Sequence, residues 1–278
     1  MRIRELLPEG LFAGKVVFIT GGGSGINLGI ARNFASLGAS IGICGRTLDR
    51  LESAREELEE LGAAVSVSVA DVRDFDALAT AFARSREELG PMDCLVCGAA
   101  GNFVARAEAL SPNGFKAVVD IDLLGSFNSA RAAFEQLGET HGSIVFVSAG
   151  QAYTPYFAQA HVGAAKAGVD NLMQNLALEW GRYGIRSNSV VPGPIDDTEG
   201  MRRLAPGKLK EQIPPLVPLR RLGTVDDVGM AAVFLASPLA SYVTGCRLVV
   251  DGGQNLPGSG LFGQLVQDAM SGKLPRSE

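Results

Sequence analysis

The chain has 278 residues, of which 46% are hydrophobic and 20% are charged, and its formal net charge is −5. This apolar content is enough for a full hydrophobic core, in one large domain or two small ones. The weak negative charge, without a basic stripe, argues against a nucleic-acid partner, and no apolar run is long enough to span a membrane.

The two ends of the sequence are where a signal that directs a protein to a cellular compartment would be found. Residues 1–14 mix arginines and glutamates with leucines and lack the apolar core and cleavage site of a secretory signal. Residues 275–278 read Pro-Arg-Ser-Glu, which is not a peroxisomal targeting tripeptide. We therefore expect a cytoplasmic protein.

Apolar, β-rich runs alternate with amphipathic helical stretches along the chain. Strands are expected at 15–20, 40–44, 64–69, 92–97, 143–148, 186–191 and 247–250. Helices are expected from a glycine-rich turn to about 37 and over about 48–61, 74–89, 111–137, 157–182 and 225–235, with short helices in an irregular segment at 195–222. This alternation predicts a single α/β domain over 1–278, with a doubly wound, seven-stranded parallel sheet and helices on both faces.

A Cys-x-x-Cys pair, Cys94 and Cys97, falls in the fourth expected strand. This spacing can indicate metal or redox chemistry. On a strand, however, residues three apart point to opposite faces. We therefore expect two separate buried thiols and no metal site.

A glycine-rich turn, Thr-Gly-Gly-Gly-Ser-Gly-Ile at 20–26, separates the first strand from the first helix. Glycines let the backbone approach a pyrophosphate, and the helix N-terminus offers free N–H groups and partial positive charge. The strand-turn-helix context favours a dinucleotide site over a merely tight turn. The predicted phosphate contacts are Gly21, Gly23, Ser24, Gly25 and Ile26.

The end of the second strand indicates which dinucleotide binds. NAD-binding chains usually have an acidic residue there, whereas this chain reads Cys44-Gly45-Arg46, and its first acid is Asp49. The guanidinium of Arg46 suits a 2′-phosphate, so NADP(H) is predicted, with a plain surface arginine as the alternative. Asp71 and Val72 follow the third strand and are expected at the adenine edge, although Asp71 could instead cap the next helix.

Several segments together resemble the short-chain dehydrogenase/reductase family over about 14–257. The turn at 20–26 matches the family's TGxxxGxG pattern except that Asn27 replaces the last glycine, and Cys97-Gly98-Ala99-Ala100 stands where the family usually has Asn-Asn-Ala-Gly. Segments 192–195 and 248–253 match the stretch beside nicotinamide and the C-terminal strand and turn. The resemblance implies a Rossmann fold with cofactor contacts from Ala99, Pro192, Gly193 and Ile195.

Within that family the chain resembles the 2,4-dienoyl-CoA reductases of the peroxisomal type. The matching stretches are 99–103, 120–122, 192–204 and 236–245. The resemblance implies NADPH-dependent reduction of a conjugated acyl thioester, carried by CoA or by an acyl-carrier protein. It also implies a homotetramer built partly on 235–257.

The family's usual catalytic residues are mostly changed in this chain. A tyrosine normally stands four residues before the lysine, on the same helix face. Lys166 is present, but Val162 occupies the tyrosine position, Ala149 the serine position and Asp122 the asparagine position. Loss of the phenol argues against ordinary alcohol–ketone chemistry, which needs an acid at the carbonyl oxygen.

The dienoyl-CoA reductases imply roles for the remaining residues. Lys166 would hold the nicotinamide ribose and supply positive charge, and Asp122 would position a water or relay a proton, unless the two form only a buried ion pair. Tyr153 and Tyr156 are the candidate proton donors, or else walls of the substrate pocket.

Four residues are assigned to substrate binding: Asn102, Phe103, Tyr156 and His161. Phe103 could equally be core, and His161 an ordinary hydrogen-bonded helix residue. The segment at 195–222 is expected to cover the substrate, and its cations would hold a CoA or phosphopantetheine phosphate unless they form a solvated face; they are Arg202, Arg203, Lys208, Lys210, Arg220 and Arg221.

Two other functions remain open on the sequence. One is a carbonyl reductase or alcohol dehydrogenase with a relocated acid such as Tyr153. The other is an NADP-binding protein with little catalysis, serving as a sensor or partner subunit. The tail at 258–278 is expected to be weakly helical over 261–270 and to pack on a neighbour or help to close the pocket.

Overall fold

The computed structural model describes residues 7–8, 10–196, 198, 201 and 207–256, with 260, 266 and 268 in the tail; at 207–209 it describes the backbone alone. Most of the tail, including the expected helix at 261–270, and most of 197–206 therefore lie outside the described residues. Within the described part, no helix is both long and apolar enough to cross a membrane.

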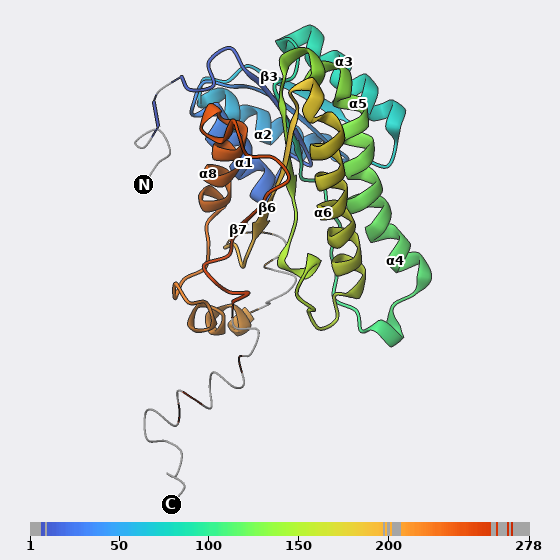
Figure 1. Cartoon of the computed structure of the whole chain (residues 1–278), viewed down its shortest axis with the longest axis vertical. Coiled ribbons are helices and arrows are strands. Elements are labelled where there is room, and N and C mark those ends of the chain that lie inside the picture. The colour runs from blue at the N-terminus through green and yellow to red at the C-terminus, as the bar shows by residue number, and fades with distance from the viewer. Residues whose placement is uncertain are drawn as a thin grey trace, which may run out of the picture.

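Seven parallel strands form one sheet in the order β3-β2-β1-β4-β5-β6-β7. Figure 1 labels β3 at one edge of this sheet and β6 and β7 toward the other. The strands are β1 Val16–Thr20, β2 Ser40–Gly45, β3 Val65–Val69, β4 Cys94–Cys97, β5 Ser143–Val147, β6 Arg186–Pro192 and β7 Arg247–Val250. All seven expected strands are confirmed. The strand order reverses between β1 and β4, and in such sheets the crevice at the reversal binds the ligand.

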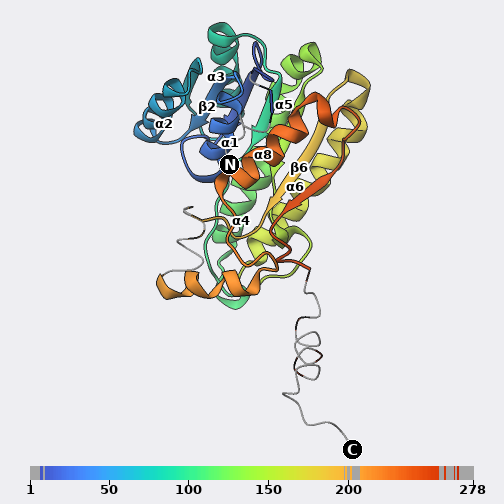
Figure 2. The same ribbon diagram turned by 90° about the vertical axis from the view of Figure 1, so that its left-hand side faces the viewer.

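Helices cover both faces of the sheet. They are α1 Gly25–Ala35, α2 Leu48–Glu60, α3 Phe75–Leu89, α4 Pro112–Val119, α5 Gly125–Thr140, α6 Ala160–Trp180 and α8 Val225–Ala236. One core joins α1, α2 and α8 to the sheet, and a second core joins α3, α5 and α6 to its other face. Figure 2 faces the layer of α1 and α8, which pack against each other across the first face.

The side-chain alternation of a strand accounts for the two cores. On β1, Val17 and Ile19 belong to the first core, and Phe18 to the second. Cys94 and Cys97 divide in the same way, which confirms the prediction of separate buried thiols. Burial raises the pKa of Cys94 to about 12, so this thiol stays protonated at neutral pH.

The expected helix at 111–137 is interrupted, and this prediction was wrong in one respect. Ser111 caps α4 as expected, by accepting a hydrogen bond from the N–H of Gly114. A π-helical turn, Asp120–Leu124, then separates α4 from α5, and the N–H of Gly125 bonds to the carbonyl of Asp120. Such turns are rare and often mark functional sites. This one contains Asp122, whose carbonyl accepts a hydrogen bond from the hydroxyl of Ser126.

One expectation about a helix end was also wrong, and the alternative assignment of Asp71 as a helix cap is excluded. The helix expected from 157 begins at Ala160, because Ala158 has a φ of 59°, in the left-handed region. Asp71 does not cap α3; Asp74 does, by accepting from the N–H of Ala77.

Gly125→Ala should destabilise the fold, because the added Cβ would lie 2.5 Å from Cγ2 of Val72. Overpacking of this kind lowers the free energy of unfolding by about 1–3 kcal/mol. Gly138→Ala is the matched control in the same helix α5, since nothing lies within 4 Å of its added Cβ. The control should be neutral or stabilising by up to about 1 kcal/mol. Equal unfolding free energies for the two variants in urea would contradict the close packing at the π-turn.

Candidate active site

A cleft of about 800 Å³ opens at the carboxyl ends of the central strands. It runs from the glycine-rich turn, past the loop after β4, to the segment after β6. Every residue assigned to the cofactor from the sequence lines it: Gly21, Gly23, Ser24, Gly25, Ile26, Arg46, Asp71, Val72, Ala99, Lys166, Pro192, Gly193 and Ile195. A volume of this size is within the range of small-molecule and cofactor sites.

The glycine-rich turn has the shape that a pyrophosphate needs. Gly21 and Gly25 have φ values of 70° and 59°, in the region that favours glycine. A Cβ on Gly21 would lie only 3.0 Å from Cα of Ala99, so a larger residue would close the cleft there. Ser24 precedes α1 in an extended conformation without a side-chain capping bond, which leaves N–H groups of the first turn directed outward. These residues fit a bound dinucleotide.

Two arginines stand at the far end of the cleft, beside the end of β2. Arg46 was expected there; Arg50, in the first turns of α2, also lines the cleft and was missed. Asp71 lies opposite and pairs with Arg73 at 2.6 Å. The hydrogen bond from Arg73 holds the pKa of Asp71 below its usual range. This end therefore carries more positive than negative charge.

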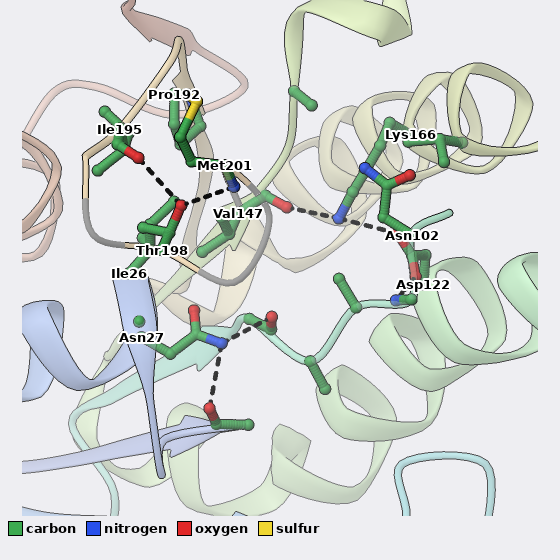
Figure 3. A pocket seen from close by; sticks show the side chains of 18 of the residues that line it. Ile26, Asn27, Asn102, Asp122, Val147, Lys166, Pro192, Ile195, Thr198 and Met201 are labelled. Carbon is green, nitrogen blue, oxygen red and sulfur yellow. Dashed lines mark hydrogen bonds and ion pairs between the residues drawn. The ribbon is translucent and has the colours of Figure 1, made fainter. Parts of the chain in front are cut away.

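The ammonium of Lys166 and the carboxylate of Asp122 meet at the other end of the cleft (Figure 3). Nζ of Lys166 lies 3.2 Å from Oδ2 of Asp122 and donates to the carbonyl of Val147 at 2.8 Å. Oδ1 of Asp122 accepts a hydrogen bond from the N–H of Gly101 at 2.7 Å. Lys166 and Asp122 are 6% and 1% exposed. The pair is thus held by backbone from β5 and from the loop after β4.

No phenol stands beside this lysine in the described part of the chain. Val162, one turn before Lys166 on α6, is buried and lines the cleft. Tyr156 lines the cleft from the loop after β5, and its hydroxyl donates to Oδ1 of Asn255 at 2.7 Å. Burial raises the pKa of Tyr156. Tyr153 is 42% exposed, lies outside the cleft wall, and has the guanidinium of Arg247 over its ring at 5.5 Å.

The residues assigned to substrate divide into two pairs. Asn102 and Tyr156 line the cleft. Phe103 and His161 are not among its lining residues; their rings pack against each other at a tilt of 44° with centroids 4.3 Å apart, and His161 is fully buried. Burial lowers the pKa of His161, so its ring is neutral near pH 7. Gln159 was missed: it lines the cleft and donates to the carbonyl of Phe103.

The segment at 195–222 reaches the cleft mainly through apolar side chains, and beyond Ile195 its lining residues were not assigned individually from the sequence: Thr198, Met201, Ile213, Leu216 and Val217. Among its expected cations, Arg202, Arg203 and the side chain of Lys208 lie outside the described residues. Lys210 pairs with Asp196, and Arg221 pairs with Asp227 at 2.7 Å. Arg220 donates to the carbonyl of Pro215. None of these last three lines the described cleft.

Comparisons with known proteins agree with this geometry. Residues 21–255 match the family model described as Enoyl-(Acyl carrier protein) reductase. The chain is 48% identical over 247 residues to the peroxisomal 2,4-dienoyl-CoA reductase SPS19 of Saccharomyces cerevisiae, covering 87% of this chain and 85% of that protein. It is 38% identical to a probable 2,4-dienoyl-CoA reductase of Bacillus subtilis, covering 86% of this chain and 96% of that protein.

Solved structures give the same result. A short chain dehydrogenase from Bacillus anthracis superposes with a TM-score of 0.80 at 38% identity, covering 88% of this chain and 98% of that one. A gluconate 5-dehydrogenase from Burkholderia cenocepacia, in complex with NADP and tartrate, has a TM-score of 0.82 at 29% identity, covering 88% and 97%. The chain therefore belongs to the short-chain dehydrogenase/reductase family of oxidoreductases, whose Rossmann fold binds a nicotinamide cofactor.

Proposed function

We propose that this protein is an NADPH-dependent reductase of 2,4-dienoyl-CoA thioesters. The observation that carries the proposal is the buried Lys166–Asp122 pair in a cleft whose usual phenol position is occupied by Val162. The relatives named as 2,4-dienoyl-CoA reductases support the same substrate class, including its CoA carrier.

Bound NADPH would supply the hydride. Reduction of a conjugated thioester gathers negative charge on the thioester oxygen and returns a proton to carbon, so the protein must stabilise an oxyanion rather than protonate it at once. Lys166 can do this. Its ammonium has three N–H donors, of which one bonds to the carbonyl of Val147. Asp122 faces it as an ion-pair partner whose Oδ2 accepts no hydrogen bond from the described residues, so donors remain for an oxygen in the cleft.

Asp122 orients that ammonium. Its Oδ1 is fixed by the N–H of Gly101, so Oδ2 keeps its position beside Nζ of Lys166. A carboxylate held there can also position the water that returns the proton to carbon. Tyr156 is the other candidate donor, but its hydroxyl hydrogen is already directed to Asn255. We therefore assign Tyr156 to the wall of the substrate pocket.

The competing functions have less support. A carbonyl reductase would need an acid at the carbonyl oxygen, and its candidate Tyr153 stands outside the cleft wall. A protein with little catalysis would have no use for a buried ion pair aimed at its cofactor cleft, because such a pair carries a desolvation cost.

The predicted homotetramer and cytoplasmic location stay proposals. The tetramer is supported by exposed apolar side chains along and before the edge strand β7, namely Leu239, Tyr242 and Val249. Burial of such side chains at a subunit contact is favourable.

The proposed reaction predicts NADPH oxidation with hexadienoyl-CoA and little or none with acetoacetyl-CoA, followed by stopped-flow absorbance. Asp122→Asn should lower the rate constant for hexadienoyl-CoA reduction at least tenfold, about 1.4 kcal/mol in activation free energy, because the neutral amide removes the negative charge that holds the ammonium. Asp120→Asn is the matched control on the same π-turn, since Asp120 pairs with Lys116 outside the cleft. An unchanged rate for Asp122→Asn would remove that residue from the mechanism, and preferential oxidation with acetoacetyl-CoA would overturn the function.

The cofactor proposal predicts a selective effect at Arg46. Arg46→Ala should weaken NADPH binding by about tenfold to a hundredfold, the range for one or two lost charge-assisted hydrogen bonds to a phosphate, while NADH binding stays the same. Arg84→Ala, which breaks an ion pair with Glu88 on α3 away from the cleft, is the control. Titration of nicotinamide fluorescence measures both affinities. Equal losses for NADPH and NADH would show that Arg46 does not read the 2′-phosphate.

A further inference from the structure

The carboxamide of Asn27 spans the cofactor cleft at the point where the strand order reverses. Its Nδ2 donates to the carbonyl of Gly98 at 2.8 Å and to the carbonyl of Gly21 at 3.2 Å (Figure 3). Gly21 belongs to the phosphate turn after β1, and Gly98 begins the loop after β4. Both carbonyls are acceptors, so the amide orientation is fixed by its partners.

These two loops are the walls between which a dinucleotide must lie. β1 and β4 are paired up to Thr20 and Cys97, and beyond that point the two chains separate. Thr20 also holds the second wall, because its Oγ1 accepts from the N–H of Gly98 at 3.1 Å. The peptide groups of Gly98 are therefore tied to the first wall on both sides, by Thr20 and by Asn27. Gly21, Asn27 and Gly98 all line the cleft.

The carboxamide of Asn27 occupies the space that a side chain at residue 98 would fill. A Cβ on Gly98 would lie 2.2 Å from Oδ1 and 2.5 Å from Cγ of Asn27. Rotation of the Asn27 side chain away from this contact would break its hydrogen bonds to both carbonyls. Asn27 in this position and a non-glycine residue 98 are thus mutually exclusive.

The same two positions are where this chain departs from the family pattern. The pattern has glycine where this chain has Asn27, and asparagine where it has Gly98. We propose that a single carboxamide has changed places across the cleft, and that Asn27 is a positioning residue which sets the separation between the phosphate turn and the wall at Ala99. The proposal rests on the cofactor half of the proposed function and not on the thioester.

The exchange predicts a reciprocal rescue. Asn27→Gly should weaken NADPH binding about tenfold, through loss of its two hydrogen bonds. Gly98→Asn alone should weaken it further, because the new side chain meets the old one. The double variant Asn27→Gly/Gly98→Asn should recover binding to within about threefold of the original protein, a non-additivity expected only of residues in contact. Nicotinamide fluorescence titration measures all four proteins.

Two controls separate positioning from general instability. Arg32→Gly places a glycine on α1 at an ion pair with Glu57, outside the cleft, and should leave NADPH affinity unchanged although thermal stability falls. Asn27→Asp keeps the shape but replaces the donors with an acceptor facing two carbonyls, so it should bind NADPH more weakly even if Asn27→Gly does not fold. For each active single variant at Asn27 or Gly98, KM for NADPH should rise while KM for hexadienoyl-CoA stays within about twofold.

The inference is overturned if Asn27→Gly and Asn27→Asp bind NADPH as the original protein does, or if the double variant binds no better than Gly98→Asn. If the original protein binds NADPH and the rescue succeeds, but no dienoyl thioester is reduced, then the proposed function fails and the positioning role stands.

Discussion

The buried ion pair between the ammonium of Lys166 and the carboxylate of Asp122 constrains the rest of this active site. Removing two charges from water is unfavourable unless good geometry and further hydrogen bonds compensate for the lost solvation. Here the compensation comes from backbone: the carbonyl of Val147 for Lys166 and the N–H of Gly101 for Asp122. The pair therefore depends on β5, on the loop after β4 and on α6 being in register. The pair also depends on the π-turn between α4 and α5, because this turn contains Asp122 and holds it at the cleft.

The cleft has two ends with different electrostatic character. At the end beside β2, Arg46 and Arg50 outweigh an Asp71 that is already paired with Arg73. At the other end, the charges of Lys166 and Asp122 balance each other in a buried setting. The first end therefore favours an anionic end of the cofactor. The second end favours negative charge that develops on a reacting oxygen, because the ammonium of Lys166 is close enough to stabilise it.

Most of the fold and of the cofactor cleft could be predicted from the sequence, because both follow from short-range patterns. Alternating apolar strands and amphipathic helices fix the sheet, and a glycine-rich strand-to-helix turn fixes the phosphate end. The π-turn could not be predicted, because no local pattern marks it, and Gly125, whose N–H closes the turn, packs against Val72 more than 50 residues away. Arg50 was not predicted, because it lies among the other charged residues of α2 and its sequence context resembles that of a solvent-exposed side chain. The departure at Asn27 was visible, but its consequence depends on Gly98, 71 positions along the chain.

Reduction of a ketone and reduction of a conjugated thioester differ in what must happen at the substrate's oxygen, and this difference decides which reaction fits the site. Hydride addition to a ketone leaves an alkoxide, so a proton donor must touch that oxygen as the bond forms. Hydride addition to a conjugated thioester leaves charge delocalised toward the thioester oxygen, and the proton is required later, at carbon. A cation with unused hydrogen-bond donors can stabilise the delocalised charge of the second reaction, but it does not meet the first reaction's need for an immediate proton. In this chain Val162 lies at the phenol position, while Lys166 lines the cleft and its ammonium bonds to the carbonyl of Val147 beside Asp122. A hydrocarbon at the phenol position beside a retained ammonium therefore fits the proposed carbon–carbon reduction better than carbon–oxygen reduction, without a change in the fold that holds the cofactor.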